Sequence, residues 1–188
     1  MEIANAIAYL HFGFSRPIIY RSVTPNNIVF TEPYVAKLFD FSRSIAIPEG
    51  ETHVEDDQLI GTVRFMAPEY IMTRKCNEKV DVYSFGVILL VLLTGLKTYE
   101  RPSWITETCD GWNLEHAVKE YIEQERFTEI VDPIVVGSGL SPEKEEQLQA
   151  FAELAFKCLS DSAEDRPTMI DIAKELRHIY KSTCQLMS

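Results

Sequence analysis

The segment from Lys79 to Gly95 limits the possible folds of this chain more than any other stretch. Its second half, Val87 to Leu93, is apolar on all sides of the predicted helix. A helix without a polar face is usually buried inside a domain, since an exposed side would leave apolar surface in water. The longest apolar run, Phe85 to Leu93, is shorter than the roughly 20 residues needed to cross a bilayer. We therefore expect a buried helix that forms the structural axis of a globular domain.

Apolar spacing and helix-capping residues predict further helices along the chain. Their expected starting residues are Met1, Asn113, Ser141 and Thr168. Ser141 is a cap followed by proline, and Thr168 has an acid three residues later; both are sequence signs of a helix start. The apolar faces predicted for the last two helices are Leu148, Phe151, Ala152, Ala155, Cys158 and Leu159, and then Met169, Ile172, Ala173, Leu176, Ile179 and Tyr180.

A short β-hairpin is predicted near the start of the chain. Ile28 to Phe30 and Val35 to Phe39 are apolar strand-like runs on either side of a turn. After them, Ser44 to Leu59 shows little periodicity and contains several acids, among them Asp56 and Asp57. This pattern is typical of a mobile, acidic surface segment.

Composition and charge limit the classes of partner. At 188 residues and 46% apolar content, the chain is expected to form one domain with a sizeable core. The formal net charge of -11 argues against nucleic acid or an anionic membrane surface, because both favour a basic face. The 4 cysteines are widely spaced without a C-x-x-C pair, which indicates reduced thiols in the cytoplasm and no metal site. We therefore expect protein partners and no direct membrane insertion.

The stretch from Ile18 to Phe30 resembles the catalytic loop of protein kinases, which reads His-Arg-Asp-Leu-Lys-Pro-x-Asn and leads into a strand. Arg21, Pro25 and Asn27 match that pattern. Asp40, which opens Asp-Phe-Ser after the hairpin, stands where kinases have Asp-Phe-Gly. In kinases this Asn and this Asp hold the magnesium ions that bridge the nucleotide phosphates. The resemblance implies a vestigial Mg-ATP site at Asn27 and Asp40, although each alone could be an ordinary turn residue.

Three positions of the loop depart from the kinase pattern. Tyr20 stands in place of the His, Ser22 in place of the catalytic Asp, and Thr24 in place of the Lys. A carboxylate can orient the acceptor hydroxyl and take its proton, whereas a neutral hydroxyl cannot. Thr24 also removes the cation that would meet the transferred phosphate. The loop therefore has the outline of a catalytic loop without its chemistry.

Other matches to the family are structural. Glu69, in Ala-Pro-Glu, and Arg166, before the last helix, occupy the positions of a buried ion pair of kinases. Asp81, near the start of the axis helix, stands where the family uses an Asp to accept hydrogen bonds from the catalytic-loop backbone. Read without the resemblance, Glu69 and Arg166 would be separate surface charges, and Asp81 would be an acid favoured by the helix dipole.

The parts of a kinase that form its small lobe have no counterpart in the sequence. There is no G-x-G-x-x-G and no Val-Ala-x-Lys, so the phosphate loop and the ATP-binding Lys are missing. We expect a mainly α fold, a kinase-like large lobe with a short β-hairpin and without a small lobe, over residues 1–180, followed by a tail at 181–188.

The resemblance is to plant receptor-like cytoplasmic kinases, and within them to ZRK-type pseudokinases, relatives of wall-associated kinase-like proteins. The residues that narrow it are Tyr20-Arg21, Asp40-Phe41-Ser42, Ile45 to Gly50 and Asp81 to Gly95.

This resemblance implies a pseudokinase, a binding module with the shape of a kinase and no bound cofactor. Members of the group act as adaptors for nucleotide-binding leucine-rich-repeat immune receptors, so such a receptor or another receptor-like kinase is the expected partner. We expect a cytoplasmic protein that partners can recruit to the plasma membrane. Two alternatives stay open at this point: a weakly active serine/threonine kinase that uses ATP, and a truncated product without a role of its own.

Overall fold

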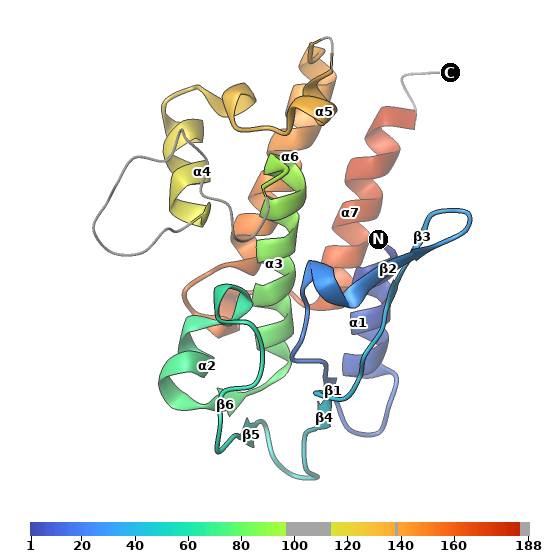
Figure 1. The fold of residues 1–188 in the computed structure, drawn as a ribbon, viewed down its shortest axis with the longest axis vertical. Helices are drawn as coiled ribbons and strands as arrows, with labels where there is room; N and C mark the ends of the chain where they lie inside the picture. The colour runs from blue at the N-terminus through green and yellow to red at the C-terminus, as the bar shows by residue number, and fades with distance from the viewer. Residues whose placement is uncertain (97–113, 138, 185–188) are drawn as a thin grey trace.

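The computed structural model of the protein describes residues 1–96, 114–137 and 139–184. The helices are α1 (Glu2–Phe12), α2 (Pro68–Thr73), α3 (Glu78–Thr94), α4 (Leu114–Glu123), α5 (Pro133–Val136), α6 (Pro142–Cys158) and α7 (Met169–Cys184), with short 3-10 turns η1 (Pro25–Asn27), η2 (Val63–Phe65), η3 (Phe127–Glu129) and η4 (Ala163–Asp165). The strands are β1 (Ile18–Ile19), β2 (Ile28–Thr31), β3 (Val35–Leu38), β4 (Ile45–Ala46), β5 (Val54–Glu55) and β6 (Lys75–Cys76). The prediction of a mainly helical fold with a short hairpin is confirmed (Figure 1).

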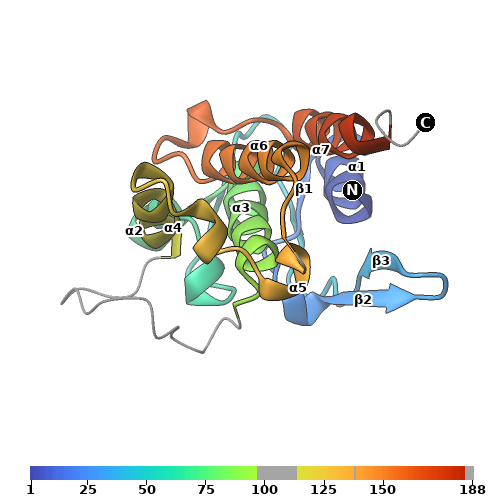
Figure 2. The same cartoon turned by 90° about the horizontal axis from the view of Figure 1, so that it is seen from above.

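Helix α3 lies at the centre of the molecule, as its apolar sequence predicts (Figures 1 and 2). It packs most extensively against α6 and also contacts α1, α4 and β1. The side chain of Asn77 accepts a hydrogen bond from the backbone N–H of Lys79 at 3.0 Å, which caps the start of the helix. Gly95 ends it with a left-handed φ of 67°. Only at Leu92, which is 60% exposed, does the apolar half of the helix clearly reach solvent.

Helix α7 packs against α1 on one side and α6 on the other (Figure 2). Both predicted helix starts are confirmed: Ser141 caps α6 through the N–H of Lys144, and the Thr168 hydroxyl accepts from the N–H of Asp171. The predicted core position Tyr180 is wrong, because its side chain is 58% exposed. The last turns of α7 extend beyond the start of α1 (Figure 1). The predicted cap Asn113 lies outside the described residues.

The acidic segment is more ordered than its sequence indicates. β2 and β3 form the predicted hairpin, but the prediction that 44–59 lacks regular structure is wrong in part. β4 pairs with β1, and β5 pairs with β6, so both strands of the segment pair with a strand outside it. Ile47 is only 3% exposed and packs in a second apolar cluster with Met66 and Tyr70. These pairings join distant parts of the chain. Strands of two residues are too short to show an alternating pattern, so the sequence did not reveal them.

No helix in the described ranges combines the length and the apolar character that crossing a membrane requires. The apolar surface of α3 is buried by the neighbouring helices α1, α4 and α6. At Gly86 the two helices α3 and α6 lie close together, since a Cβ at this position would lie 2.7 Å from Cβ of Cys158 and 3.2 Å from the carbonyl oxygen of Ala155. A glycine here lets α3 and α6 pack closely.

We expect Gly86→Ala to lower the free energy of unfolding by about 1 to 3 kcal/mol, because the added methyl group forces the two helices apart. Urea denaturation monitored by circular dichroism measures this change. Gln149→Ala on the exposed face of α6 is the control and should stay within about 0.5 kcal/mol. Equal stability of Gly86→Ala and the parent chain would show that the helices do not depend on this approach.

Candidate functional site

The loop between β1 and β2 carries the residues predicted to correspond to a catalytic site. Ser22 and Thr24 are buried, at 2% and 5% exposure. The side-chain amide of Asn27 donates to the carbonyl oxygen of Ser22 at 2.9 Å and to its Oγ at 2.6 Å. The structure thus brings Ser22 and Asn27 together. The Ser22 oxygen accepts this hydrogen bond, and a neutral hydroxyl in this state has little capacity to take a further proton.

Asp81 fixes the start of this loop. Its carboxylate is fully buried and accepts hydrogen bonds from the backbone N–H groups of Tyr20 at 2.7 Å and Arg21 at 2.8 Å. It also pairs with Nε2 of His11, on α1, at 2.9 Å. Arg21 adopts a left-handed φ of 61°, which is unusual for a residue with a side chain and is held by this contact.

Sequence reasoning did not identify His11, which is 2% exposed. The only signal was its position four residues after Ile7, on the apolar face of α1. That spacing predicts burial, but it cannot indicate that the imidazole meets a carboxylate on another helix.

Tyr20 connects the loop to the segment that begins at Asp40. Its hydroxyl donates to the carbonyl oxygen of Phe39, and its ring packs edge to face with that of Phe41 at a centroid distance of 5.3 Å. Burial, helped by the nearby charges of Asp40 and Asp81, raises the pKa of Tyr20 to about 12. The phenol therefore stays protonated near neutral pH and keeps its role as a donor.

Asp40 is exposed and has a left-handed φ of 58°. Its Oδ1 accepts hydrogen bonds from the hydroxyl of Ser42 at 2.5 Å and from the Ser42 backbone N–H at 3.2 Å. These bonds, the hydroxyl first, lower the pKa of the Asp40 carboxyl, so it is ionised at neutral pH. Ser42 thus uses its side chain to hold Asp40 in one orientation.

Arg21 makes a charge pair that the sequence did not reveal. Its Nη1 lies 2.7 Å and 2.9 Å from the two oxygens of Asp56, and its Nε donates to the carbonyl oxygen of Arg43 at 2.5 Å. Asp56 also accepts a hydrogen bond from the hydroxyl of Tyr70 at 2.7 Å. The expectation that Asp56 is a solvated surface acid is wrong: its side chain is only 9% exposed. No spacing rule connects positions this far apart in the sequence.

Glu69 and Arg166 form a bidentate pair. Nη1 and Nη2 of Arg166 lie 2.6 Å and 2.8 Å from the two carboxylate oxygens of Glu69. Arg166 is 1% exposed and lies over the ring of Tyr83, with 5.0 Å between its Cζ and the ring centroid. Its Nε donates to the carbonyl oxygen of Ser160. Every face of this guanidinium is therefore in contact with protein, while the Glu69 side chain retains 27% exposure.

Comparison with known proteins assigns the chain to a family. Residues 1–180 match the protein kinase domain. The chain belongs to the protein kinase family. It is 40% identical over 186 residues to non-functional pseudokinase ZED1 of Arabidopsis thaliana, covering 96% of this chain and 54% of that protein. It is 38% identical over 180 residues to non-functional pseudokinase ZRK2 of the same plant, covering 95% of this chain and 48% of that protein.

Serine/threonine-protein kinase ZRK1, also from Arabidopsis thaliana, is 38% identical over 182 residues, which cover 96% of this chain and 50% of that protein. The resemblance to ZRK-type kinase homologues is therefore confirmed. The chain spans about half the length of these curated relatives, of which ZED1 and ZRK2 are named non-functional pseudokinases and ZRK1 a serine/threonine-protein kinase.

In a kinase domain, Mg²⁺ neutralises the nucleotide phosphates when it is bound. The oxygens that remain to hold it here are Oδ1 of Asn27 and Oδ2 of Asp40, because the other polar atoms of the two side chains already form hydrogen bonds. An amide and a carboxylate oxygen suit this ion only where phosphates and water complete its shell. The neighbouring Ser22 and Thr24 add two buried hydroxyls and no charge. Asn27 and Asp40 would therefore supply only part of the coordination shell of the ion, and the neighbouring hydroxyls would supply no proton acceptor.

We expect Asp56→Asn to lower the free energy of unfolding by about 2 kcal/mol, because the nearly buried Arg21 charge loses its partner. Hydrogen exchange should become faster across 44–60. Asp57→Asn is the matched control, since this neighbouring side chain is exposed, and it should leave both quantities unchanged. Similar behaviour of the two variants would contradict the proposed role of the Arg21–Asp56 pair.

Removal of one charge from the other pair tests its contribution. Glu69→Gln leaves Arg166 buried without a carboxylate, and we expect a loss of about 2 kcal/mol, less than for a fully buried pair because Glu69 is partly exposed. Glu153→Gln, on the exposed face of α6, serves as the control. Urea denaturation that gives the same midpoint for both variants would argue against a stabilising pair.

Proposed function

We propose that this chain is a catalytically inactive protein-kinase homologue that acts as a protein-binding adaptor. The observation that carries the proposal is the Ser22 hydroxyl, buried and bonded to Asn27 at the position predicted for the catalytic carboxylate. A general base of this kind contributes about 10² to 10⁴-fold to the rate. A neutral oxygen that already accepts a hydrogen bond does not supply that contribution.

The surroundings of Ser22 support the same proposal. Thr24, predicted to replace the loop Lys, is buried and uncharged, so no cation from that position meets a phosphate. The contacts that shape the loop, from Asp81 and from Tyr20, are all present. A domain with its scaffold in place and without its proton acceptor retains surfaces for binding. The names of ZED1 and ZRK2 as non-functional pseudokinases agree with this view.

We propose a nucleotide-binding leucine-rich-repeat receptor as the partner, in plant immune signalling, with other receptor-like kinases as further candidates. The support is the similarity to ZRK-type proteins and a net charge of -11, which favours protein partners over nucleic acid. In this role the protein is cytoplasmic and reaches the plasma membrane through its partners. ATP has no part in the proposed activity.

A weak serine/threonine kinase is the second candidate. Asn27 and Asp40 keep oxygens that could contact a metal ion, and ZRK1, at 38% identity, is named a serine/threonine-protein kinase. A small lobe from another part of the protein or from a partner would have to cover the nucleotide. The two candidates differ in one measurable property, the transfer of phosphate to protein hydroxyls.

We expect the purified chain to transfer no phosphate from Mg-ATP to a general protein substrate above the level without enzyme, and its melting temperature not to respond to Mg-ATP. Radiolabel transfer and thermal-shift titration measure these two properties. Asp40→Asn is the diagnostic variant, and Asp57→Asn is the control with the same chemical change. Transfer that disappears in Asp40→Asn and persists in Asp57→Asn would establish the kinase alternative.

The adaptor role makes a separate prediction. Co-expression with plant leucine-rich-repeat immune receptors should give a complex that co-elutes in size-exclusion chromatography, and Ser22→Ala should bind equally well because the hydroxyl has no catalytic task. Failure of the chain to associate with any of these receptors would count against this partner class.

A further inference from the structure

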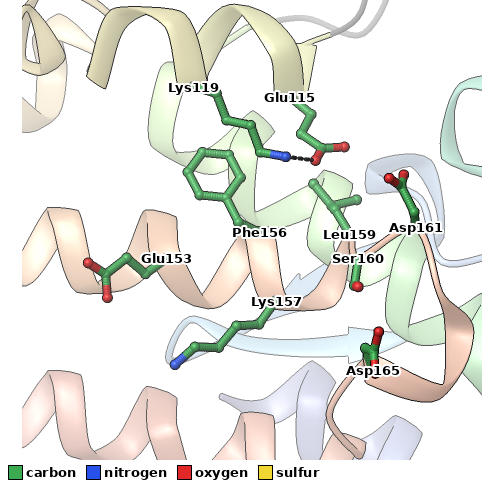
Figure 3. A pocket seen from close by; sticks show the side chains of 9 residues that line it. All are labelled: Glu115, Lys119, Glu153, Phe156, Lys157, Leu159, Ser160, Asp161 and Asp165. Atoms are coloured by element: carbon green, nitrogen blue, oxygen red, sulfur yellow. Dashed lines mark hydrogen bonds and ion pairs between the residues drawn. The ribbon is translucent and has the colours of Figure 1, made fainter. Parts of the chain in front are cut away.

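A cavity of about 560 Å³ opens between α4, the last turns of α6 and the loop that leads to η4. None of its lining residues belongs to the catalytic-type loop, and the cavity lies where α4 faces α6 (Figure 3). Its volume is within the roughly 300 to 1,000 Å³ of typical ligand sites. The residues that line it are Glu115, Lys119, Glu153, Phe156, Lys157, Leu159, Ser160, Asp161 and Asp165.

The apolar part of the cavity lies between α4 and α6. Phe156 and Leu159 project from α6 toward α4 (Figure 3). The Phe156 ring is only partly buried, and Nζ of Lys119 lies 5.4 Å from its centroid. This lysine is paired with Glu115, at 2.5 Å between Nζ and Oε1. The Phe156 ring therefore already carries the Lys119 ammonium on one face, and the charges of Lys119 and Glu115 cancel.

The remaining charge of the cavity is negative. Asp161 and Asp165 lie at the loop end, and both are exposed. Within the described part of the chain, neither carboxylate forms an ion pair. Lys157 points away from α4, to the other side of α6 (Figure 3). With Lys119 paired to Glu115, the charged groups that remain in the lining are Glu153, Asp161 and Asp165 against Lys157. The net charge of the cavity is therefore negative, which favours a positively charged ligand.

We propose that this cavity binds an arginine side chain from a basic segment of a partner protein. Its aliphatic stem would pack on Phe156 and Leu159, and its guanidinium would reach Asp161 and Asp165 at the loop end. Arginine suits this lining better than lysine, because its planar guanidinium can pair with carboxylates through two parallel hydrogen bonds. The net charge of -11 would also speed the approach of a basic segment. This inference rests on the proposed adaptor function and specifies the chemistry of the partner's contact.

A short fluorescent peptide with two arginines around a leucine tests the proposal, with the same peptide carrying glutamines instead of arginines as its control. Fluorescence anisotropy should give saturable binding of the arginine peptide that weakens as salt increases. Asp161→Asn combined with Asp165→Asn should weaken binding about tenfold. Glu49→Gln combined with Glu51→Gln makes the same charge change on exposed acids outside the cavity and should alter it less than about twofold.

Phe156→Leu supplies a second variant, which keeps an apolar side chain and removes part of the surface on which the arginine stem packs; we expect binding about threefold weaker. Unchanged melting temperatures confirm that the variants are folded. Equal weakening by the two double variants would mean that the peptide binds through general charge attraction alone, and it would overturn the proposal. Equal binding of the arginine and glutamine peptides would also overturn it.

The peptide experiment involves neither ATP nor an immune receptor. Phosphate transfer by the chain would overturn the adaptor function and leave the peptide result as measured. Loss of peptide specificity together with intact receptor association would overturn only the assignment of this cavity.

Discussion

A buried carboxylate on the first turn of α3 holds together parts of the chain that are far apart in the sequence. Asp81 accepts hydrogen bonds from His11 on α1 and from the backbone of Tyr20 and Arg21. A carboxylate without access to water is stable only when such donors replace its hydration. Because α3 is itself surrounded by other helices, this contact places the loop relative to the core. The left-handed backbone of Arg21 follows from the same interaction.

Shape and chemistry are therefore supported by different residues in this domain. The contacts of Asp81, and the bidentate pair of Glu69 with Arg166, stabilise the arrangement of helices and loops. The hydroxyl of Ser22 is held in the loop by its hydrogen bond to Asn27, and neither residue takes part in these contacts. The proposed loss of catalysis therefore concerns residues other than those that hold the scaffold together.

Local signals in the sequence predicted the elements well. An all-apolar helix, a Ser-Pro helix start and the Thr168–Asp171 cap are each encoded within a few neighbouring residues, and the structure contains all of them. The positions of Glu69 and Arg166 came from family motifs, because no periodic pattern joins them. The catalytic-type roles of Ser22 and Asp40 stay predictions that rest on the same motifs.

The features that sequence reasoning missed depend on contacts between distant segments. His11 and Asp56 each meet a charged partner on another element, and nothing near them in the chain indicates that partner. Tyr180 continues the apolar pattern of α7 but is 58% exposed. The short strands β4 and β5 are fixed by the strands they pair with, which lie elsewhere in the sequence. Periodicity describes one element, whereas these features need two.

The pair of Arg21 with Asp56 has a further consequence. The guanidinium already has a carboxylate and a backbone carbonyl as partners, so a phosphate brought to it would compete with a resident anion. The segment 44–59 thus supplies the counter-ion of Arg21 itself, through Asp56. The segment can therefore be held in this position without phosphorylation by another enzyme.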